Sequence, residues 1–133
     1  MKPYGHMKRF DIQTSAHTEL VDITTKIQQL IGEDCVAVII YVPHTTCALT
    51  INEGADPDVQ TDAVSQLNKI VPWDQGFKHM EGNSAAHIKA MLVGNSVTVL
   101  VEHGKLQLGT WEKIFLCEFD GSRKRSIWIQ ELR

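Results

Sequence analysis

The sequence predicts an α+β fold, and three observations support this class. Residues 35–42, "CVAVIIYV", form a β-branched apolar run without alternation, which is typical of a strand covered on both faces. Apolar residues recur at helical spacing in 23–31 and again after the Asp56-Pro57 pair. The last third of the chain returns to strand-like runs. We therefore expect strands before and after about three helices.

Length and composition indicate one globular domain, residues 1–133. The formal net charge of −3 gives no general attraction to nucleic acid or to an anionic membrane. The longest apolar run is too short to cross a bilayer, and the N-terminal "MKPYGHMKRF" lacks the apolar core of a secretion signal. We therefore expect a cytoplasmic protein. Its three cysteines have no CxxC spacing, which predicts buried small hydrophobic residues.

The first half of the chain is predicted to begin with a strand over 7–14 and a short strand over 17–21. A helix follows within 22–34, where either Asp22 or Thr24 is the N-cap and a glycine ends the helix. Its predicted inward residues are Ile23, Ile27, Leu30 and Ile31.

The segment after Pro43 alternates between polar and apolar side chains, which predicts a strand with a polar face and an apolar face. The polar, small-residue face contains His44, Thr46, Ala48, Thr50 and Asn52, and the apolar face contains Thr45, Cys47, Leu49 and Ile51.

Two further helices are predicted. Asp56 and Pro57 suit the N-cap and first position of one helix, and Gly94 ends another over 84–92. The residues predicted to face the core are Val59, Ala63, Leu67 and Ile70 in the first of these and Ile88, Met91 and Leu92 in the second.

Three strands are predicted late in the chain, over 96–101, 111–119 and 124–130, with the last two paired as a hairpin through the turn "DGSR". Both faces of these last two strands carry apolar groups. Either the helices cover all of this surface or part of it contacts another subunit.

Three of the six histidines stand in suggestive places. His44 opens the polar strand face, His79 lies in a glycine-flanked loop, and His87 lies in the first turn of the next helix. Folding can bring such residues together as a three-histidine shell for zinc or another transition metal. The alternative is that each histidine has a structural hydrogen bond of its own.

Chain geometry limits this interpretation. His44 and Asn52 lie about 26 Å apart in a straight strand, so they cannot line one small pocket. Either a bulge folds the segment back, or its two ends serve different pockets, and we favour the second.

A phosphate site is predicted from the late cations. Arg123, Lys105 and backbone N–H groups near Gly109-Thr110 can hold a phosphate group. Trp111 either stacks on a ligand ring or belongs to the core or an interface.

Three segments, "PHTTCALTINEGADPDV", "HMEGNSAAHIKAMLVGNS" and "SVTVLVEHGKLQLGTWEKIFLCEFDGSRKR", resemble the YjbQ family, also called UPF0047. The resemblance covers essentially the whole chain. Its most specific pattern is a serine, alternating aliphatic residues, a glycine and then Gly-Thr-Trp, ending here at Trp111. Glutamine usually follows that tryptophan, whereas this chain has Glu112.

The resemblance implies a β-sandwich-like α+β core and a homotrimer whose sheets pack about the threefold axis. Similar proteins are named secondary thiamine-phosphate synthase, which implies transfer of a small phosphorylated substrate at a histidine-rich site between subunits. The implied catalytic residues are His44, Glu53, Trp111 and Arg123, the implied substrate- and phosphate-binding residues are Thr45, Thr46, Asn52, Lys105, Thr110 and Arg123, and the candidate metal ligands are His44, His79 and His87.

Two cofactor hypotheses accompany this assignment. One is zinc or another transition metal at the histidines, and the other is Mg²⁺ held with a diphosphate substrate by Glu53 or Asp56. A metal-dependent hydrolase would use the same groups. The alternative from a different class is a non-catalytic trimer that binds a metal or small ligand.

Overall fold

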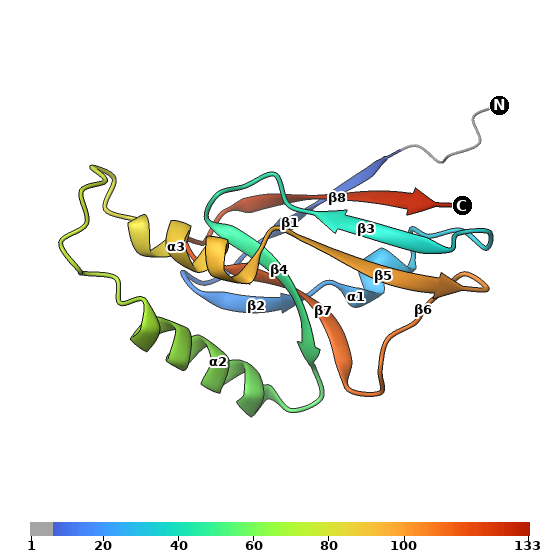
Figure 1. The fold of residues 1–133 in the computed structure, drawn as a ribbon, viewed down its shortest axis with the longest axis horizontal. Coiled ribbons are helices and arrows are strands. Elements are labelled where there is room, and N and C mark those ends of the chain that lie inside the picture. The colour runs from blue at the N-terminus through green and yellow to red at the C-terminus, as the bar shows by residue number, and fades with distance from the viewer. Residues whose placement is uncertain (1–6) are drawn as a thin grey trace.

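The structure is a computed structural model and describes residues 7–133. Among these residues the strands are β1 (Lys8–Gln13), β2 (Glu19–Asp22), β3 (Ala37–Tyr41), β4 (Cys47–Glu53), β5 (Ser96–Glu102), β6 (Lys105–Leu106), β7 (Glu112–Glu118) and β8 (Lys124–Leu132). The helices are α1 (Thr24–Gln28), α2 (Pro57–Ile70) and α3 (Ser84–Val93) (Figure 1). The expected mixture of strands with three helices is confirmed, although α1 is shorter than expected and β6 was not predicted.

The strands form two antiparallel sheets. One sheet has five strands in the order β1-β8-β3-β5-β6, and the other has three in the order β2-β7-β4. The predicted hairpin between 111–119 and 124–130 is therefore wrong, because β7 and β8 belong to different sheets. Each of these strands already pairs along both of its edges, β7 with β2 and β4 and β8 with β1 and β3, so neither has an edge free for the other. The "DGSR" segment carries the chain from one sheet to the other.

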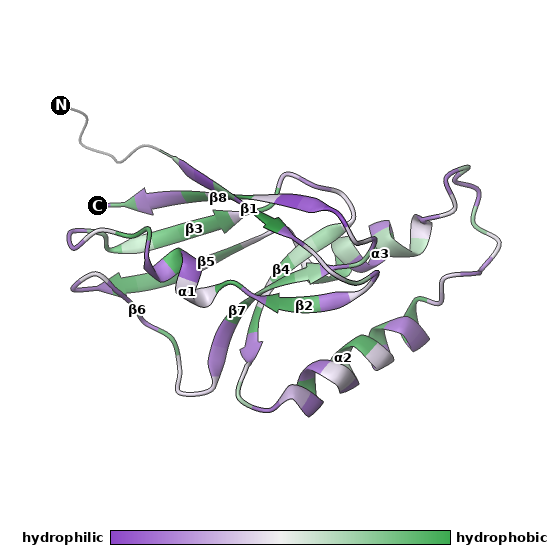
Figure 2. Cartoon of the chain, turned by 180° about the vertical axis from the view of Figure 1, so that it is seen from behind, coloured by the Kyte–Doolittle hydropathy of each residue, from purple (hydrophilic) through white to green (hydrophobic). Residues whose placement is uncertain are grey.

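The main core lies between the two sheets. Inward residues of the five-stranded sheet, such as Val38, Ile40 and Ile129, belong to one buried cluster with Leu49 and Leu116 of the three-stranded sheet. Each such side chain contributes about 1.5–3 kcal/mol by leaving water. Much of β3, β4 and β5 is accordingly hydrophobic (Figure 2). The arrangement is the expected sandwich-like core. Cys47, Leu49 and Ile51 face this core as predicted. Thr45 of the predicted apolar face is exposed, whereas Thr46 and Ala48 of the predicted polar face are buried.

Helix α3 covers the other face of the three-stranded sheet. Ala86 and Ala90 of α3 join Ala48 of β4 and Phe119 in a second buried cluster. Small side chains allow the helix backbone to approach the sheet closely. The inward face predicted for this helix is therefore wrong in part.

The bulkiest residues of that predicted face point outward. Met91 is 79% exposed and Leu92 is 61% exposed. Lys89 is instead buried, with 2% exposed.

Helix α2 begins as predicted but is only loosely packed. The Asp56 carboxylate accepts a hydrogen bond from the Asp58 backbone N–H at 2.9 Å, which confirms the N-cap. No residue of α2 is fully buried, and Val59 and Ile70 are 38% and 60% exposed. Of the predicted inward face, Leu67 contacts the second cluster.

The outward face of the five-stranded sheet is partly apolar and open. Leu100 and Leu132 both pair with Ala37 and are 68% and 37% exposed. In the row formed by Tyr41 and its partner Trp128, the two ring centroids lie 5.8 Å apart. The sequence analysis predicted that such an apolar face is covered either by helices or by another subunit. Among the residues of these two rows, only Ala37 is buried.

Smaller expectations have mixed outcomes. All three cysteines are free and buried, as predicted. The Asp22 carboxylate accepts a hydrogen bond from the Thr24 N–H at 2.9 Å, just before α1. Within residues 7–133 no helix is both long enough and apolar enough to cross a membrane.

Candidate functional site

The candidate residues divide between the two ends of β4. His44 and Thr45 precede the strand, whereas Asn52 and Glu53 end it. The first pair lines one cavity and the second pair lines another. This separation agrees with the strand length and with the expectation of two pockets.

The cavity at the start of β4 is the histidine pocket, with a volume of about 390 Å³. It lies between the β3–β4 connection and α3. Its lining residues are His44, Thr45, Cys47, His87, Ala90, Met91, Gly94 and Asn95. Folding therefore brings two of the three candidate histidines to one cavity.

The third candidate, His79, lies beside His87. Their ring centroids are 5.4 Å apart and the rings are nearly perpendicular, at 88°. His79 is also 4.0 Å from the Glu81 carboxylate. No group of three or more His, Cys, Asp or Glu residues within 7–133 has an arrangement that would hold a metal ion. The described residues of one chain therefore do not gather His44, His79 and His87 into a three-histidine shell. His6 lies outside the described residues.

The hydrogen bond made by His44 limits its chemistry. Its Nε2 accepts from the Ser126 backbone N–H at 2.9 Å. Burial, followed by the positive charge of Arg125, lowers the pKa of His44, so the ring is neutral near pH 7. A neutral imidazole that accepts at Nε2 carries its proton on Nδ1. His44, which lines the pocket, is thus a hydrogen-bond donor at Nδ1 while the Ser126 bond persists.

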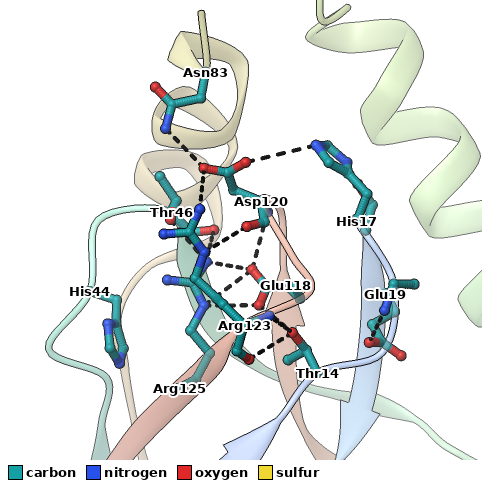
Figure 3. Close-up of polar contacts among 12 residues, drawn as sticks. Thr14, His17, Glu19, His44, Thr46, Asn83, Glu118, Asp120, Arg123 and Arg125 are labelled. Carbon is teal, nitrogen blue, oxygen red and sulfur yellow. Dashed lines mark hydrogen bonds and ion pairs between the residues drawn. The ribbon is translucent and has the colours of Figure 1, made fainter. Parts of the chain in front are cut away.

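Next to His44 lies a buried polar network that links the two sheets (Figure 3). Glu118 of β7 and Arg125 of β8 are 0% and 2% exposed and form an ion pair. Thr14 donates its hydroxyl to the Glu118 carboxylate at 2.8 Å. The Arg125 guanidinium also donates to the Thr46 hydroxyl at 2.9 Å and to the Thr46 carbonyl at 3.1 Å. Thr46, predicted to bind substrate, is 5% exposed and is held by this network.

The network continues toward the surface through Asp120. Its carboxylate accepts from the Arg123 guanidinium at 3.1 Å and from the Asn83 amide at 2.9 Å, just before α3. His17 lies 3.9 Å from the other carboxylate oxygen. Arg123 is thus positioned by Asp120, and its side chain remains 52% exposed. It is close enough to His44 to help lower the pKa of that ring.

The residues at the far end of β4 form a separate group. Glu53 accepts from the Asp56 N–H at 3.0 Å, and the Asn52 side chain accepts from the Glu53 N–H at 2.7 Å. Both residues line a largely apolar cavity of about 330 Å³ beneath α2. Trp111, whose carbonyl accepts from the Gly54 N–H at 2.8 Å, is 62% exposed and is therefore not a core residue.

The remaining predicted phosphate ligands, Lys105 and Thr110, are exposed residues of β6 and of the segment that leads to β7. Neither lines the histidine pocket. The Glu112 carboxylate accepts from the Gly109 N–H at 2.7 Å, so it holds the turn that precedes Trp111. One chain brings none of these residues to His44.

Comparison with known proteins identifies the family. A sequence profile described as "UPF0047 protein YjbQ-like" matches residues 8–133. The chain belongs to the UPF0047 family. UPF0047 protein MJ1081 of Methanocaldococcus jannaschii is 47% identical, covering 92% of this chain and 91% of that one. UPF0047 protein YugU of Bacillus subtilis is 44% identical, covering 93% and 97%.

A solved structure supports the same assignment. The conserved hypothetical protein TT1486 of Thermus thermophilus superimposes with a TM-score of 0.91 at 40% identity, covering 94% of this chain and 99% of that one. These family names state no activity. The resemblance inferred from the sequence is confirmed, and function has to be argued from the site.

The buried network is the part of the site that sequence reasoning missed. Its signal was present in the UPF0047 chain as a charge within or beside an apolar strand segment: Glu118 lies inside the apolar run "IFLCEF", and Arg125 precedes "SIWI". Charged residues are almost never fully buried unless they are paired. Glu118 and Arg125 carry opposite charges at the strand ends on either side of one turn, so a buried ion pair between them could have been predicted.

Proposed function

We propose that the protein is an enzyme that transfers or hydrolyses a small phosphorylated compound at the histidine pocket, and that thiamine-phosphate synthesis is one such activity. The observation that carries this proposal is the opening of His44 and His87 into one cavity. Thiamine-phosphate synthesis joins a pyrimidine-methyl diphosphate to a thiazole phosphate and releases diphosphate. It therefore requires donors and positive charge near the leaving oxygens.

His44 supplies a donor of the required kind. Because its Nε2 is occupied by the Ser126 N–H, the Nδ1–H is the group that can donate to a phosphate oxygen. Two arginines, Arg125 and Arg123, lie close enough to His44 to help burial lower its pKa, and the Glu118 carboxylate opposes them. The Arg123 side chain remains 52% exposed beside Asp120. A partly exposed arginine near a neutral hydrogen-bond donor favours an anionic ligand.

A divalent transition metal is proposed at the pair His79 and His87. Two imidazoles bound to one zinc ion place their ring centroids roughly 5 Å apart, and these rings are 5.4 Å apart. The third ligand would come from substrate or from a neighbouring copy, because the described residues of one chain supply no third group. Such an ion would polarise a phosphate oxygen when bound. Mg²⁺ carried by a diphosphate substrate remains the second cofactor hypothesis.

Assembly is part of the proposal. We propose a homotrimer in which the far end of β4 in one copy, with Asn52, Glu53 and Trp111, faces the histidine pocket of the next. The open apolar face of the five-stranded sheet favours such an assembly, because exposed apolar patches mark interfaces. The contact between copies would unite groups that the two ends of β4 keep apart within one chain.

Complementation tests the activity. A strain lacking its main thiamine-phosphate synthase should grow when it expresses this protein and should fail with His44→Ala or His87→Ala. His103→Asn is the matched control, because His103 is an exposed histidine with φ of 52°, a conformation that asparagine tolerates. Undiminished growth with the joint loss of His44, His79 and His87 would defeat the site. Ligand binding without turnover under any metal would favour the non-catalytic alternative.

Mixed oligomers test the shared site. We expect His44→Ala and Glu53→Gln each to be inactive alone and to regain part of the activity when the two variants are co-expressed, since some contacts then join two intact halves. Glutamine keeps the acceptor that Glu53 offers to the Asp56 N–H. Mixtures that stay as inactive as either variant would show that no site joins His44 of one copy with Glu53 of another.

A further inference from the structure

Lys89 is a buried amine without a carboxylate partner. It lies on α3 and is 2% exposed, yet it makes no ion pair with any described residue. Its ammonium group donates to the side-chain oxygen of Asn68 on α2. The Phe119 ring lies at 6.0 Å, the outer limit of a cation–π contact. One amide oxygen leaves two of the three ammonium donors without a described partner.

The other buried charges of residues 7–133 are paired. Glu118 and Arg125 pair with each other, and Glu131, which is 1% exposed, contacts Lys8 and Arg133. Burying an unpaired charge is costly, and such groups are rare. Lys89 is therefore the exception that needs a reason.

A cavity opens at this amine. It has a volume of about 390 Å³ and is lined by Lys89, Asn68, Trp73, His17 and Thr18. The residues come from α3, from α2 and the segment after it, and from the β1–β2 connection. It shares no lining residue with the histidine pocket.

The walls of this cavity offer donors and an aromatic surface. None of its lining residues is acidic. The Trp73 ring packs edge-on against His17, with centroids 4.5 Å apart, and its indole N–H makes no hydrogen bond to a described residue. His17 bridges to the buried network, 3.9 Å from Asp120 (Figure 3). A volume in this range suits a small molecule.

We propose that this Lys89 pocket binds a small molecule with a carboxylate or phosphate group, placing the anion at the Lys89 ammonium and the apolar part against Trp73. The anion would balance the charge of the Lys89 ammonium, which no carboxylate of the described residues balances. The indole N–H and the Asn68 amide are further donors for its oxygens. The inference does not depend on the activity proposed for the histidine pocket.

The electrostatics of Lys89 agree with this assignment. Burial lowers the pKa of its amine, and no nearby carboxylate opposes that shift. A bound anion would reverse the effect, because an opposite charge at contact favours the ammonium form.

The test uses the full chain and three probes of matched shape: benzoate, phenyl phosphate and neutral benzamide, at ionic strength matched with sodium chloride. Thermal unfolding and tryptophan fluorescence are followed against probe concentration. We expect one of the two anions to raise Tm and change the fluorescence in a saturable way, while benzamide has no effect. Comparison of benzoate with phenyl phosphate identifies the preferred group.

Two variants make the test specific. Lys89→Met should weaken anion binding by at least about tenfold, since it removes a charged hydrogen-bond donor, and should leave the ligand-free protein at least as stable as the wild type. Lys78→Met, which changes an exposed loop lysine, should leave binding unchanged. If Lys89→Met does not fold, NMR of the wild type replaces it: an anion should shift the Trp73 indole signal, assigned with Trp73→Phe.

Three results would overturn the proposal. The first is no response to either anion beyond that to chloride. The second is an equal response in Lys89→Met or to benzamide. The third is borohydride trapping of an aldehyde on Lys89 without any response to anions, which would assign the amine to carbonyl chemistry instead.

Discussion

The Glu118 carboxylate and the Arg125 guanidinium form an ion pair inside the protein, with 0% and 2% of these residues exposed. Glu118 belongs to the three-stranded sheet and Arg125 to the five-stranded sheet. The pair therefore fastens the two layers of the sandwich together. It lies beside His44 and fixes Thr46, so the shape of the histidine pocket depends on it.

Breaking this pair should destabilise the protein strongly. Glu118→Ala leaves the Arg125 charge buried and unpaired, which costs about 3–5 kcal/mol. The double variant Glu118→Met/Arg125→Met should lose less than Glu118→Ala, because no lone charge remains. Urea unfolding measures both, with Asp62→Ala on the exposed side of α2 as a control within about 0.5 kcal/mol of wild type. Equal losses for the single and double variants would contradict this reasoning.

Glu118 should also make stability fall at acidic pH. Burial alone would raise its pKa, but hydrogen bonds from Arg125 and Thr14 outweigh burial and hold the pKa below its ordinary value. A lowered carboxyl pKa gives stability that is present above the unfolded value of about 4.3 and lost as the pH falls through the folded value. Urea unfolding from pH 7 to pH 3 should therefore show a loss that Glu118→Gln lacks. A parallel decline in both proteins would assign acid sensitivity to other groups.

Sequence reasoning reached the fold class and most elements because the apolar periodicity of this chain is clear. It failed where tertiary packing overrides a local pattern. The hairpin between β7 and β8 was predicted because "DGSR" is a good turn. Strand pairing depends, however, on packing between segments that are distant in the sequence. Pairing of His44 with the Ser126 backbone depends on contacts between distant segments, which spacing along the chain does not encode.

The packing of α3 illustrates the same limit. Met91 and Leu92 looked inward by hydrophobicity, yet the helix turns its alanines to the sheet. Ala86, at 0% exposure, should not tolerate enlargement. We expect Ala86→Leu to lower the free energy of unfolding by about 1–3 kcal/mol through overpacking. Leu92→Ala, on the exposed side, is the control and should change it by less than about 0.5 kcal/mol when the protein is dilute enough to be monomeric. If urea unfolding shows a larger loss for Leu92→Ala than for Ala86→Leu, the inward face predicted from the sequence would be correct.

His44 should contribute a second pH dependence near neutrality. Burial and the charge of Arg125 lower its pKa in the folded protein, so the unfolded chain binds a proton more readily. Stability should therefore fall as the pH drops through about 6.5, the unfolded value, and level off below the folded value. His44→Gln should remove this component, whereas His103→Asn should retain it. NMR titration offers a direct check: the His44 ring should titrate below pH 6.5, and a higher midpoint would refute the assigned environment.

The last prediction concerns the open face of the five-stranded sheet. If this face joins the copies of a homotrimer, a charge there should separate them, because burying an unpaired charge in an apolar contact is unfavourable. Leu100 is 68% exposed and its partner Ala37 lies in the same row, so Leu100→Asp should not disturb the core of one chain. Analytical ultracentrifugation should find a trimer for the wild type and monomers for Leu100→Asp, with unchanged circular dichroism. Thr61→Asp, on the exposed surface of α2, is the control and should remain trimeric. If Leu100→Asp remains trimeric, the copies contact each other through another surface. The underside of α2 would then be tested next.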